Sequence, residues 1–440
     1  MSSIRISTAS KDIRNTIHLT GSKSESNRAL IIRALSKGVV LVENLSAAAD
    51  TVTLTEILDL ENGGQKLEVA KYQLQTDNSK LITQNSNPPI SNLLNIGPAG
   101  TAMRFLTSFF SVQTGEVILT GSERMLQRPI RILVDALREI GAEIEYHGIE
   151  GFPPLKIKGP LVQQENSITI NGNISSQYIS ALLLIAPTLS EGLELQILGE
   201  LTSRPYVEMT LAMLEQCGIK SDWQENRIYI GRQDFKSSTL TIEPDWSAAS
   251  YWYAIAALSE SAEIFLPGLS KYSLQGDSCI TEIMANFGIT SQFKDGGVLL
   301  TKEPKKLERK FFDFKDCPDL AQTVIVCCAA LGHDATFTGL ETLKIKETDR
   351  VLALQTELEK IGVKLIEKNQ SCKLDCSGLK FPKKLRVSTY EDHRMAMAFA
   401  PLALLIAELE IENFRVVEKS YPHFWKDLEK VGFEINEYCV

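Results

Sequence analysis

The chain has 440 residues, of which 44% are hydrophobic and 23% are charged, and this composition excludes disordered and collagen-like proteins. The length exceeds what one ordinary hydrophobic core supports, so we expect two or three domains. The net charge of −9 disfavours a protein that binds nucleic acid or a membrane surface nonspecifically.

Targeting segments and metal-binding spacings are not evident in the sequence. The start, MSSIRISTASKDIRN, lacks the apolar stretch of a secretory signal, and the longest apolar runs are shorter than the ~20 residues of a membrane span. We therefore expect a soluble cytoplasmic protein without a membrane partner. The eight cysteines form no disulfide framework and are predicted to be reduced, and the five histidines show no zinc spacing, so we predict no metal.

A pattern repeats six times along the chain. Long apolar runs with helical character recur at intervals of 70–76 residues, a regularity that indicates duplicated supersecondary units; they start near Arg28, Thr101, Gln177, Ser247, Ala321 and Arg394. A second series of amphipathic segments ends in glycine, as in VDALREIG, TLAMLEQCG, TEIMANFG, TELEKIG and KDLEKVG. Six repeats divide naturally into two sets of three.

Each repeat reads as a buried helix, a short β-rich segment, a second helix and a hairpin. The β-rich segments are, in chain order, VVLVENL, EVILTGS, LELQILG, AEIFLPG, ATFTGL and LEIENF. Alternating β and α elements predict an α/β or α+β fold. Because the first helices are apolar nearly all round, as in WYAIAAL, we expect three of them at the centre of each domain with sheets outside.

The boundary between the two sets is predicted near Pro244 and Asp245, which gives one domain over residues 21–244 and a second over 245–440. The strand ahead of Gly21 could belong to either half. The stretch from Glu61 to Asn95 is rich in Asn, Gln and Ser, and we expect long hairpin loops there.

Residues suited to anions gather where the repeated helices begin. GSKSESNRAL combines hydroxyls with Lys23 and Arg28 at a helix start, which suits a phosphate or carboxylate; a serine-capped helix with solvated bases is the alternative. Similar residues at the same phase of later repeats favour the anion site, namely Gly100 and Arg104 in GPAGTAMR, Arg128 in QRPIR, Ser175, Ser176 and Gln177 in ISSQYIS, Ser203, Arg204 and Tyr206 in SRPYVEM, Lys346 and Arg350 in KETDR, His393 and Arg394 in EDHRMAM, and Lys419 in VEKSYPHF.

Two carboxylates stand among these cations. Asp319, in CPDLAQT, begins the fifth buried helix, and cations near it would keep it ionised and able to accept a proton from a hydroxyl. A charge that only favours the helix dipole is an equal alternative for Asp319. Glu347 lies between Lys346 and Arg350, and it could be only their turn partner.

The whole series of motifs resembles the EPSP synthase (3-phosphoshikimate 1-carboxyvinyltransferase) family of the enolpyruvyl transferases. The resemblance rests on GSKSESNRAL, GPAGTAMR, LTGSERMLQRPI, SSQYISALL, SRPYVEMTL, PDLAQT, KETDR and EDHRMAMAFAPLAL, in this order over nearly the whole chain. It implies two similar domains, each of three βαβαββ units with buried central helices, an inside-out α/β barrel, and it implies that residues 1–20 join the second domain with 245–440.

The resemblance also implies the reaction. The enolpyruvyl group of phosphoenolpyruvate is transferred to the 5-hydroxyl of 3-phosphoshikimate through a tetrahedral intermediate, and phosphate is released. The expected partners are these two small molecules only. No metal or cofactor is implied, and a monomer is expected.

Site residues are implied by the matching motifs. Asp319 would deprotonate the 5-hydroxyl, Glu347 would deliver a proton to the methylene carbon, and Lys23 would contact both substrates. The 3-phosphoshikimate site would contain Lys23, Ser24, Arg28, Ser175, Ser176, Gln177, Ser203, Tyr206, Asp319, Thr342 and Lys346. The phosphoenolpyruvate site would contain Lys23, Gly100, Arg128, Gln177, Arg350, Arg394 and Lys419.

Three residues depart from the common pattern of the family, namely Pro98, Phe105 and Thr342. The related UDP-N-acetylglucosamine enolpyruvyl transferases are the alternative within the superfamily; they typically carry a reactive cysteine in the loop that here reads GSERMLQRP. A noncatalytic anion-binding protein is the alternative outside it. The fourth repeat, with DWSAAS and LQGDS, has no strong cation at its helix starts, and we interpret it as mainly structural.

Overall fold

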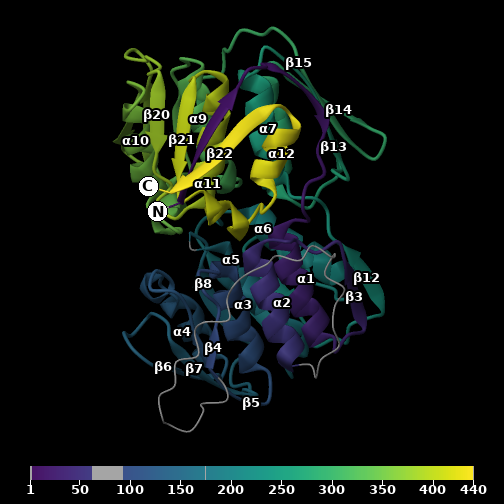
Figure 1. The fold of residues 1–440 in the computed structure, drawn as a ribbon. Coiled ribbons are helices and arrows are strands. Elements are labelled where there is room, and N and C mark those ends of the chain that lie inside the picture. Colours follow the sequence, from purple (N-terminus) through teal and green to yellow (C-terminus); the bar gives the residue numbers. More distant parts are fainter. Residues whose placement is uncertain (1, 62–92, 174, 440) are drawn as a thin grey trace.

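The computed structural model describes residues 2–61, 93–173 and 175–439. They form two lobes joined at a narrow waist, with the first and last strands side by side in the upper lobe (Figure 1). No helix among these residues is long and apolar enough to cross a membrane.

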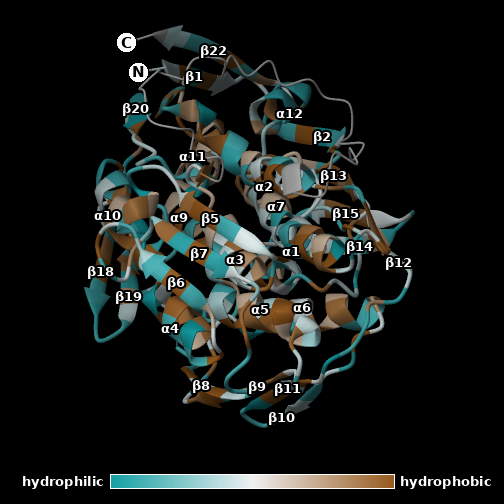
Figure 2. Ribbon diagram, turned by 90° about the horizontal axis from the view of Figure 1, so that it is seen from below, coloured by the Kyte–Doolittle hydropathy of each residue, from teal (hydrophilic) through white to brown (hydrophobic). Residues whose placement is uncertain are grey.

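Six helices form the centres of the two lobes. They are α1 (Lys23–Leu35), α3 (Gly100–Ser111) and α5 (Ser176–Ile185) in the lower lobe, and α7 (Trp246–Leu258), α9 (Ala321–Ala330) and α11 (His393–Phe399) in the upper lobe. Within each lobe the three helices contact one another. Every residue of α9 and α11 is buried, as the apolar sequences predict, and Figure 2 shows these helices inside a periphery of strands.

Each central helix leads into a strand with a fixed pairing. These strands are β3 (Val40–Glu43), β5 (Gly115–Thr120), β9 (Leu193–Leu198), β13 (Ser261–Pro267), β17 (Thr336–Thr338) and β21 (Glu408–Glu412). Each pairs in parallel with one neighbour, respectively β12 (Ser238–Thr241), β4 (Leu93–Asn95), β8 (Ser167–Asn171), β2 (Asp12–Thr16), β16 (Phe311–Asp313) and β20 (Lys384–Val387). The predicted repeat is therefore visible in the strand pairing.

A pair of antiparallel strands completes five of the sheets that the structure describes, and in four of them this pair is a hairpin. Its inner strand pairs antiparallel with the strand after the central helix, and its outer strand lies at the sheet edge. The hairpins are β6–β7 (Glu143–Tyr146, Leu155–Gly159), β10–β11 (Asp222–Gln224, Arg227–Ile230), β14–β15 (Ile289–Lys294, Gly297–Lys302) and β18–β19 (Lys364–Lys368, Ser371–Asp375). In the last unit β1 (Ser2–Thr8) takes the inner position beside β22 (Phe433–Cys439). The N-terminal strands β1 and β2 thus belong to sheets of the upper lobe.

The second helices are α2 (Ala49–Glu61), α4 (Arg131–Glu139), α6 (Arg204–Gln216), α8 (Ile280–Ala285), α10 (Arg350–Glu359) and α12 (Phe424–Lys430). Buried apolar side chains form two separate clusters. One gathers residues between Ala29 and Ile242, and the other gathers Ile4 to Leu19 with residues from Trp246 to Phe433. The chain crosses between the clusters beside the isolated bridge of Gly21 with Pro244.

Two local predictions were wrong. The first central helix begins at Lys23 instead of near Arg28, because Ser22 caps it by accepting a hydrogen bond from the Glu25 amide. Glu61 ends α2 and Leu93–Asn95 form a strand, so both ends of the predicted loop region are regular structure. The remainder of that prediction lies outside the described residues. Seven cysteines are free among the residues described.

Candidate active site

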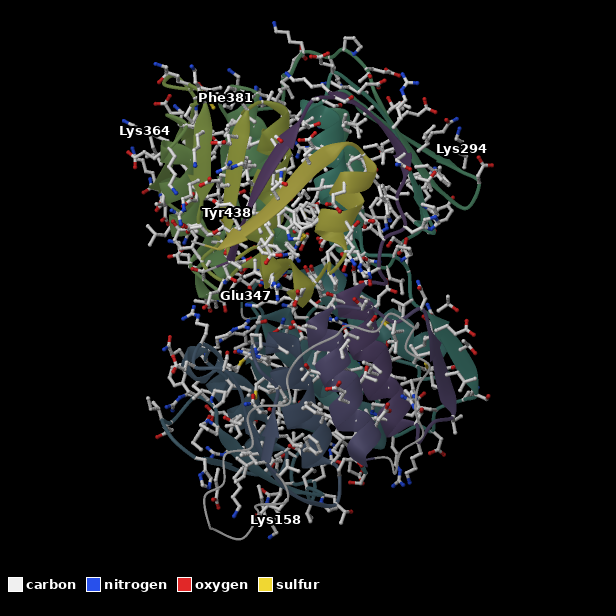
Figure 3. All side chains as sticks on the ribbon, viewed as in Figure 1. Lys158, Lys294, Glu347, Lys364, Phe381 and Tyr438 are labelled. Atoms are coloured by element: carbon white, nitrogen blue, oxygen red, sulfur yellow. The ribbon has the colours of Figure 1, made fainter. Side chains whose placement is uncertain are left out.

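Starts of central helices from both lobes face one cavity at the waist. Four of them are capped by a side chain that accepts a backbone hydrogen bond. The capping residues are Ser22, Ser175, Asp245 and Asp392. The cavity is lined by every predicted site residue except Arg204 and Lys419; Arg204 is exposed and pairs with Glu208. Figure 3 shows the labelled Glu347 at the waist between the lobes. Side chains that are spread over the whole sequence therefore meet because each repeat presents the same helix end.

In the lower lobe the buried cation Arg28 is held by neutral oxygens. Its Nε donates to Thr210 Oγ1 at 2.7 Å, its Nη2 donates to Ser180 Oγ at 3.1 Å, and its Nη1 donates to the Ser24 carbonyl at 2.8 Å. Arg28 forms no ion pair within the described part of the chain. Burial lowers the pKa of its guanidinium to about 10. An anion that enters the cavity would therefore pair with a positive charge that is poorly solvated.

Further hydroxyl groups line the cavity that Arg28 lines. Ser175 caps α5, Ser176 opens that helix, and Ser203 lies before α6 in the left-handed conformation with φ of 55°. The Tyr206 ring contacts the Arg28 guanidinium at 5.9 Å, and Gln177 donates to Thr101 Oγ1 at 3.0 Å. Hydroxyl donors beside a desolvated arginine suit a phosphate group.

Gly100 lets Arg128 approach the start of α3. A Cβ added at Gly100 would lie 2.3 Å from Arg128 Nη1, so any side chain would displace the guanidinium. Arg128 is 7% exposed, and its Nε has no hydrogen-bond partner among the described residues. Arg128 thus lines the cavity with a buried donor that has no partner among the described residues.

Lys23, at the start of α1, is placed differently from these arginines. Its Nζ pairs with Asp50 at 3.1 Å, and its backbone amide donates to Asp245 Oδ2 at 3.1 Å. A ligand that binds the Lys23 ammonium therefore has to compete with Asp50.

Asp319 lies where both lobes meet. Its carboxylate contacts Arg394 Nη2 at 2.8 Å and Arg350 Nη1 at 3.2 Å, Lys346 Nζ is 3.9 Å away, and Tyr206 of the lower lobe donates to it at 3.3 Å. Burial raises the pKa of Asp319, but Arg394, Lys346 and Arg350 outweigh burial and hold it below the usual range. The carboxylate is ionised and can accept a proton.

Glu347 lies beside Asp319 in the same network. Arg350 is 2% exposed and binds Glu347 at 2.8 Å and Asp392 at 2.6 Å, in addition to Asp319. Burial raises the pKa of Glu347, but Arg350, Arg128 and Lys23 together hold it well below its usual value. In the ligand-free protein Glu347 is therefore ionised. Burial and the nearby Lys23 and Arg394 lower the pKa of His393, which is neutral.

Lys419 and Thr342 differ from their neighbours. Lys419 lines an adjacent cavity with Arg124, Arg128 and Glu347, and its Nζ donates to the Glu391 carbonyl at 2.8 Å. The structure thus places it next to the main cavity instead of in it. Thr342 lines the main cavity, and its buried hydroxyl has no partner within the described residues.

The fourth repeat, which we interpreted as mainly structural, also contributes to the lining of the cavity. Asp245, Ser247 and Tyr251 line the cavity, although none of them is a cation. Ser247 donates to the buried Asp277, whose pKa burial and Asp319 raise to about 7. Ser247 Oγ accepts from Arg394 Nη2 at 3.4 Å, so this repeat supports the partner of Asp319.

Some residues of the site were missed in the sequence. Asp245 and Asp392 occupy the helix-cap position that Ser22 and Ser175 occupy in other repeats, so their phase could have revealed them. Asp50 and Arg124 gave no signal, because their partners lie far away in the chain. In the described part of the chain no group of three His, Cys, Asp or Glu side chains is arranged to hold a metal.

The comparisons with known proteins agree with one another. A sequence model described as EPSP synthase (3-phosphoshikimate 1-carboxyvinyltransferase) matches residues 7–428. A 3-phosphoshikimate 1-carboxyvinyltransferase of Bacteroides fragilis (strain YCH46) is 46% identical over 430 residues, which is 97% of each chain. One from Mannheimia haemolytica is 33% identical over 96% of this chain and 97% of its own.

Solved structures share the fold. An EPSP synthase from Acinetobacter baumannii has a TM-score of 0.73 at 19% identity and covers 100% of both chains. The enolpyruvyl transferase NikO from Streptomyces tendae has a TM-score of 0.72 at 16% identity, over 100% of this chain and 99% of its own. These likenesses confirm the predicted fold class.

Proposed function

This chain belongs to the EPSP synthase family, and we propose that its waist cavity transfers the carboxyvinyl group of phosphoenolpyruvate to the 5-hydroxyl of 3-phosphoshikimate. The products are 5-enolpyruvylshikimate 3-phosphate and phosphate, and the enzyme serves the shikimate pathway and aromatic amino acid biosynthesis. One observation carries the assignment of roles. The ionised Asp319 is held between Arg350 and Arg394, next to Glu347, at the junction of the lobes.

The two substrates are expected to divide between the lobes. The lower lobe offers Ser175, Ser176, Ser203 and the unpaired Arg28, which suit the phosphate of 3-phosphoshikimate. Phosphoenolpyruvate carries a phosphate and a carboxylate close together, and it suits the convergence of Arg128 with the arginines of the upper lobe. Lys23, between the two regions, would contact both ligands.

In the addition step the 5-oxygen attacks C2 of phosphoenolpyruvate. Asp319 accepts the proton of the 5-hydroxyl, and the methylene carbon C3 receives a proton from Glu347, which gives the tetrahedral intermediate. In the elimination step Glu347 takes a proton back from C3, the C2–C3 double bond forms again and the bond from C2 to the phosphate oxygen breaks, so that phosphate leaves and carries away the proton held by Asp319. No redox change or co-reactant enters this balance.

The acid role of Glu347 requires the ligands. Free Glu347 is ionised because Arg350, Arg128 and Lys23 surround it. When phosphoenolpyruvate pairs with these cations, their effect on Glu347 is partly cancelled and its pKa rises. The substrate thus prepares the acid that protonates it, and a proton taken up on binding is the expected consequence.

The lobes are proposed to act as two domains, residues 21–244 and residues 1–20 with 245–440, that enclose the ligands and exclude water. The two separate hydrophobic clusters support this division. We also propose a monomeric, cytoplasmic enzyme, since one chain supplies the described lining of the cavity. A sedimentation mass of two chains would contradict the monomer.

The central test is phosphate release from both substrates without added metal. The wild-type protein should release phosphate, and Asp319→Asn should lower turnover by about 100-fold or more because the 5-hydroxyl loses its base. Calorimetry should show that Asp319→Asn still binds 3-phosphoshikimate. Asp316→Asn is the matched control, since Asp316 is exposed three residues before Asp319, and it should keep wild-type turnover.

Three results would contradict the proposal. Full turnover in Asp319→Asn would show that Asp319 is not the base. Phosphate release that requires UDP-N-acetylglucosamine in place of 3-phosphoshikimate would favour the related transferases. Binding of both ligands by the wild-type protein without any release would favour a noncatalytic anion-binding protein.

A further inference from the structure

The turn that carries Lys346 and Glu347 has little local support. It lies between a 3-10 helix, Glu341–Ile345, and α10, whose N-cap is Asp349. The Asp349 carbonyl accepts from the Ala353 amide, so the carbonyls of Lys346 and Glu347 precede the first acceptor of α10. Backbone carbonyls in such a turn need partners from elsewhere.

Arg124 of the lower lobe supplies these partners. Its Nε donates to the Glu347 carbonyl at 3.0 Å, and its Nη2 donates to the Lys346 carbonyl at 3.2 Å. The planar guanidinium fork therefore spans two successive peptides of the upper lobe. Contacts of this kind can form only when the two lobes are together.

Both side chains of the turn reach the reacting groups. Lys346 Nζ is 3.9 Å from Asp319 Oδ1, and Glu347 Oε2 is 2.8 Å from Arg350 Nη2. A shift of the turn would move both charges relative to Asp319. The loop of Arg124 also carries Arg128, which lines the cavity, so a ligand bound by Arg128 would hold the same loop against the upper lobe.

We propose that Arg124 is a positioning residue that fixes the Lys346–Glu347 turn from across the cleft and so couples closure of the lobes to placement of the proton donor. The inference rests on the proposed function. It assigns no substrate contact to Arg124.

Steady-state kinetics with both substrates test the positioning role. Arg124→Gln should lower kcat by about 10-fold to 100-fold, because the turn loses two charge-assisted hydrogen bonds. The KM for 3-phosphoshikimate should stay near the wild-type value, and the pH profile of kcat should shift because Glu347 leaves its cation shell. Arg131→Gln is the control; Arg131 pairs with Glu150 on the surface of the same lobe, and kcat should not change.

Hydrogen exchange gives a readout that does not require turnover. In the protein saturated with 3-phosphoshikimate and phosphoenolpyruvate, Arg124→Gln should raise amide exchange over residues 343–352, and Arg131→Gln should not. If the wild-type protein fails to turn over, the proposed function is wrong, whereas the exchange result still decides whether Arg124 holds the turn.

Two results would overturn the inference. One is wild-type kcat and wild-type exchange in Arg124→Gln. The other is a raised KM with kcat unchanged, which would make Arg124 a ligand-binding residue. If Arg124→Gln does not fold, Arg124→Lys decides instead. This variant keeps the charge but lacks the planar fork, so kcat should again fall, by less than the fall expected for Arg124→Gln.

Discussion

The two lobes hold their buried arginines in opposite ways. In the lower lobe, Arg28 and Arg104 are surrounded by neutral oxygens; Arg104 donates to the carbonyls of Gly100 and Pro129. In the upper lobe, Arg350 and Arg394 are bound to Asp319, and Arg350 also binds two further carboxylates. Burial lowers the pKa of Arg28 and Arg104 to about 10, whereas the carboxylates raise the pKa of Arg350 and Arg394.

This difference assigns different work to the two lobes. A buried cation without a counter-charge is costly until an anion arrives, so the lower lobe is prepared for binding. Cations that already hold carboxylates gain less from another anion, but they fix those carboxylates in place for proton transfer. We therefore expect 3-phosphoshikimate to bind the lower lobe without phosphoenolpyruvate.

The strongest test of the contrast removes Arg350. Arg350→Met leaves Asp319, Glu347 and Asp392 buried without their shared partner, and it should lower the free energy of unfolding by about 3–5 kcal/mol. Urea unfolding followed by circular dichroism measures this loss. A stability close to that of the wild-type protein would show that the upper network is not built on Arg350.

Arg28→Met should behave in the opposite way. The free energy of unfolding should fall by less than about 2 kcal/mol, because no carboxylate is left unpaired and Thr210, Ser180 and the Tyr206 carbonyl still bond to one another. Affinity for 3-phosphoshikimate should fall by about 100-fold, since a buried charge pair with the phosphate is lost. Calorimetric titration measures the affinity.

Arg33→Met is the control for Arg28, because Arg33 lies at the far end of the same helix and pairs with Asp59. Its affinity for 3-phosphoshikimate should equal that of the wild-type protein. Equal losses of affinity in both variants would indicate a general effect of helix α1 instead of a direct contact.

The contrast between the lobes also explains what could be predicted from the sequence. The repeat interval and the capped helix starts are local signals, and they predicted the six central helices and the convergence of Ser175, Arg128 and Arg394. The pairing of each cation is a tertiary property. Arg28 and Arg350 look alike as basic residues near helix starts, yet only the packing shows that one faces hydroxyls and the other faces three carboxylates.

Missed and misplaced residues have the same physical origin. Asp277 accepts a hydrogen bond from Ser247, and Ser247 accepts one from Arg394. These contacts join segments that lie far apart in the sequence. Arg124 acts on backbone carbonyls of the other lobe, and backbone acceptors leave no trace in residue identity. Lys419 has the expected residue type, but its ammonium group is engaged by the Glu391 carbonyl beside the main cavity.

A pH-dependent effect is expected at the crossing between the lobes, where Glu25 belongs to neither pattern. Its side chain is 5% exposed, accepts from the Glu243 amide at 3.1 Å, and faces Glu243, Asp245 and Gln275. Burial and the nearby Glu243 raise its pKa from 4.5 to about 8, so the folded protein keeps a proton that the unfolded chain has lost. The free energy of unfolding should therefore fall as pH rises through this window, by at most about 1.4 kcal/mol per pH unit.

Replacement of Glu25 tests whether the crossing adds this pH dependence to the two lobes. Glu25→Gln keeps the hydrogen-bonding shape without a titrating proton, and it should flatten the decline of stability between pH 4.5 and about 8. Glu56→Gln, at an exposed position of α2, should leave the decline intact. Urea unfolding at several pH values measures both. If Glu25→Gln declines as steeply as the wild-type protein, Glu25 is not the source of the decline, which then comes from another carboxyl whose pKa burial raises, such as Asp277. Asp319 and Glu347 cannot cause it, because their lowered pKa values stabilise the fold as pH rises.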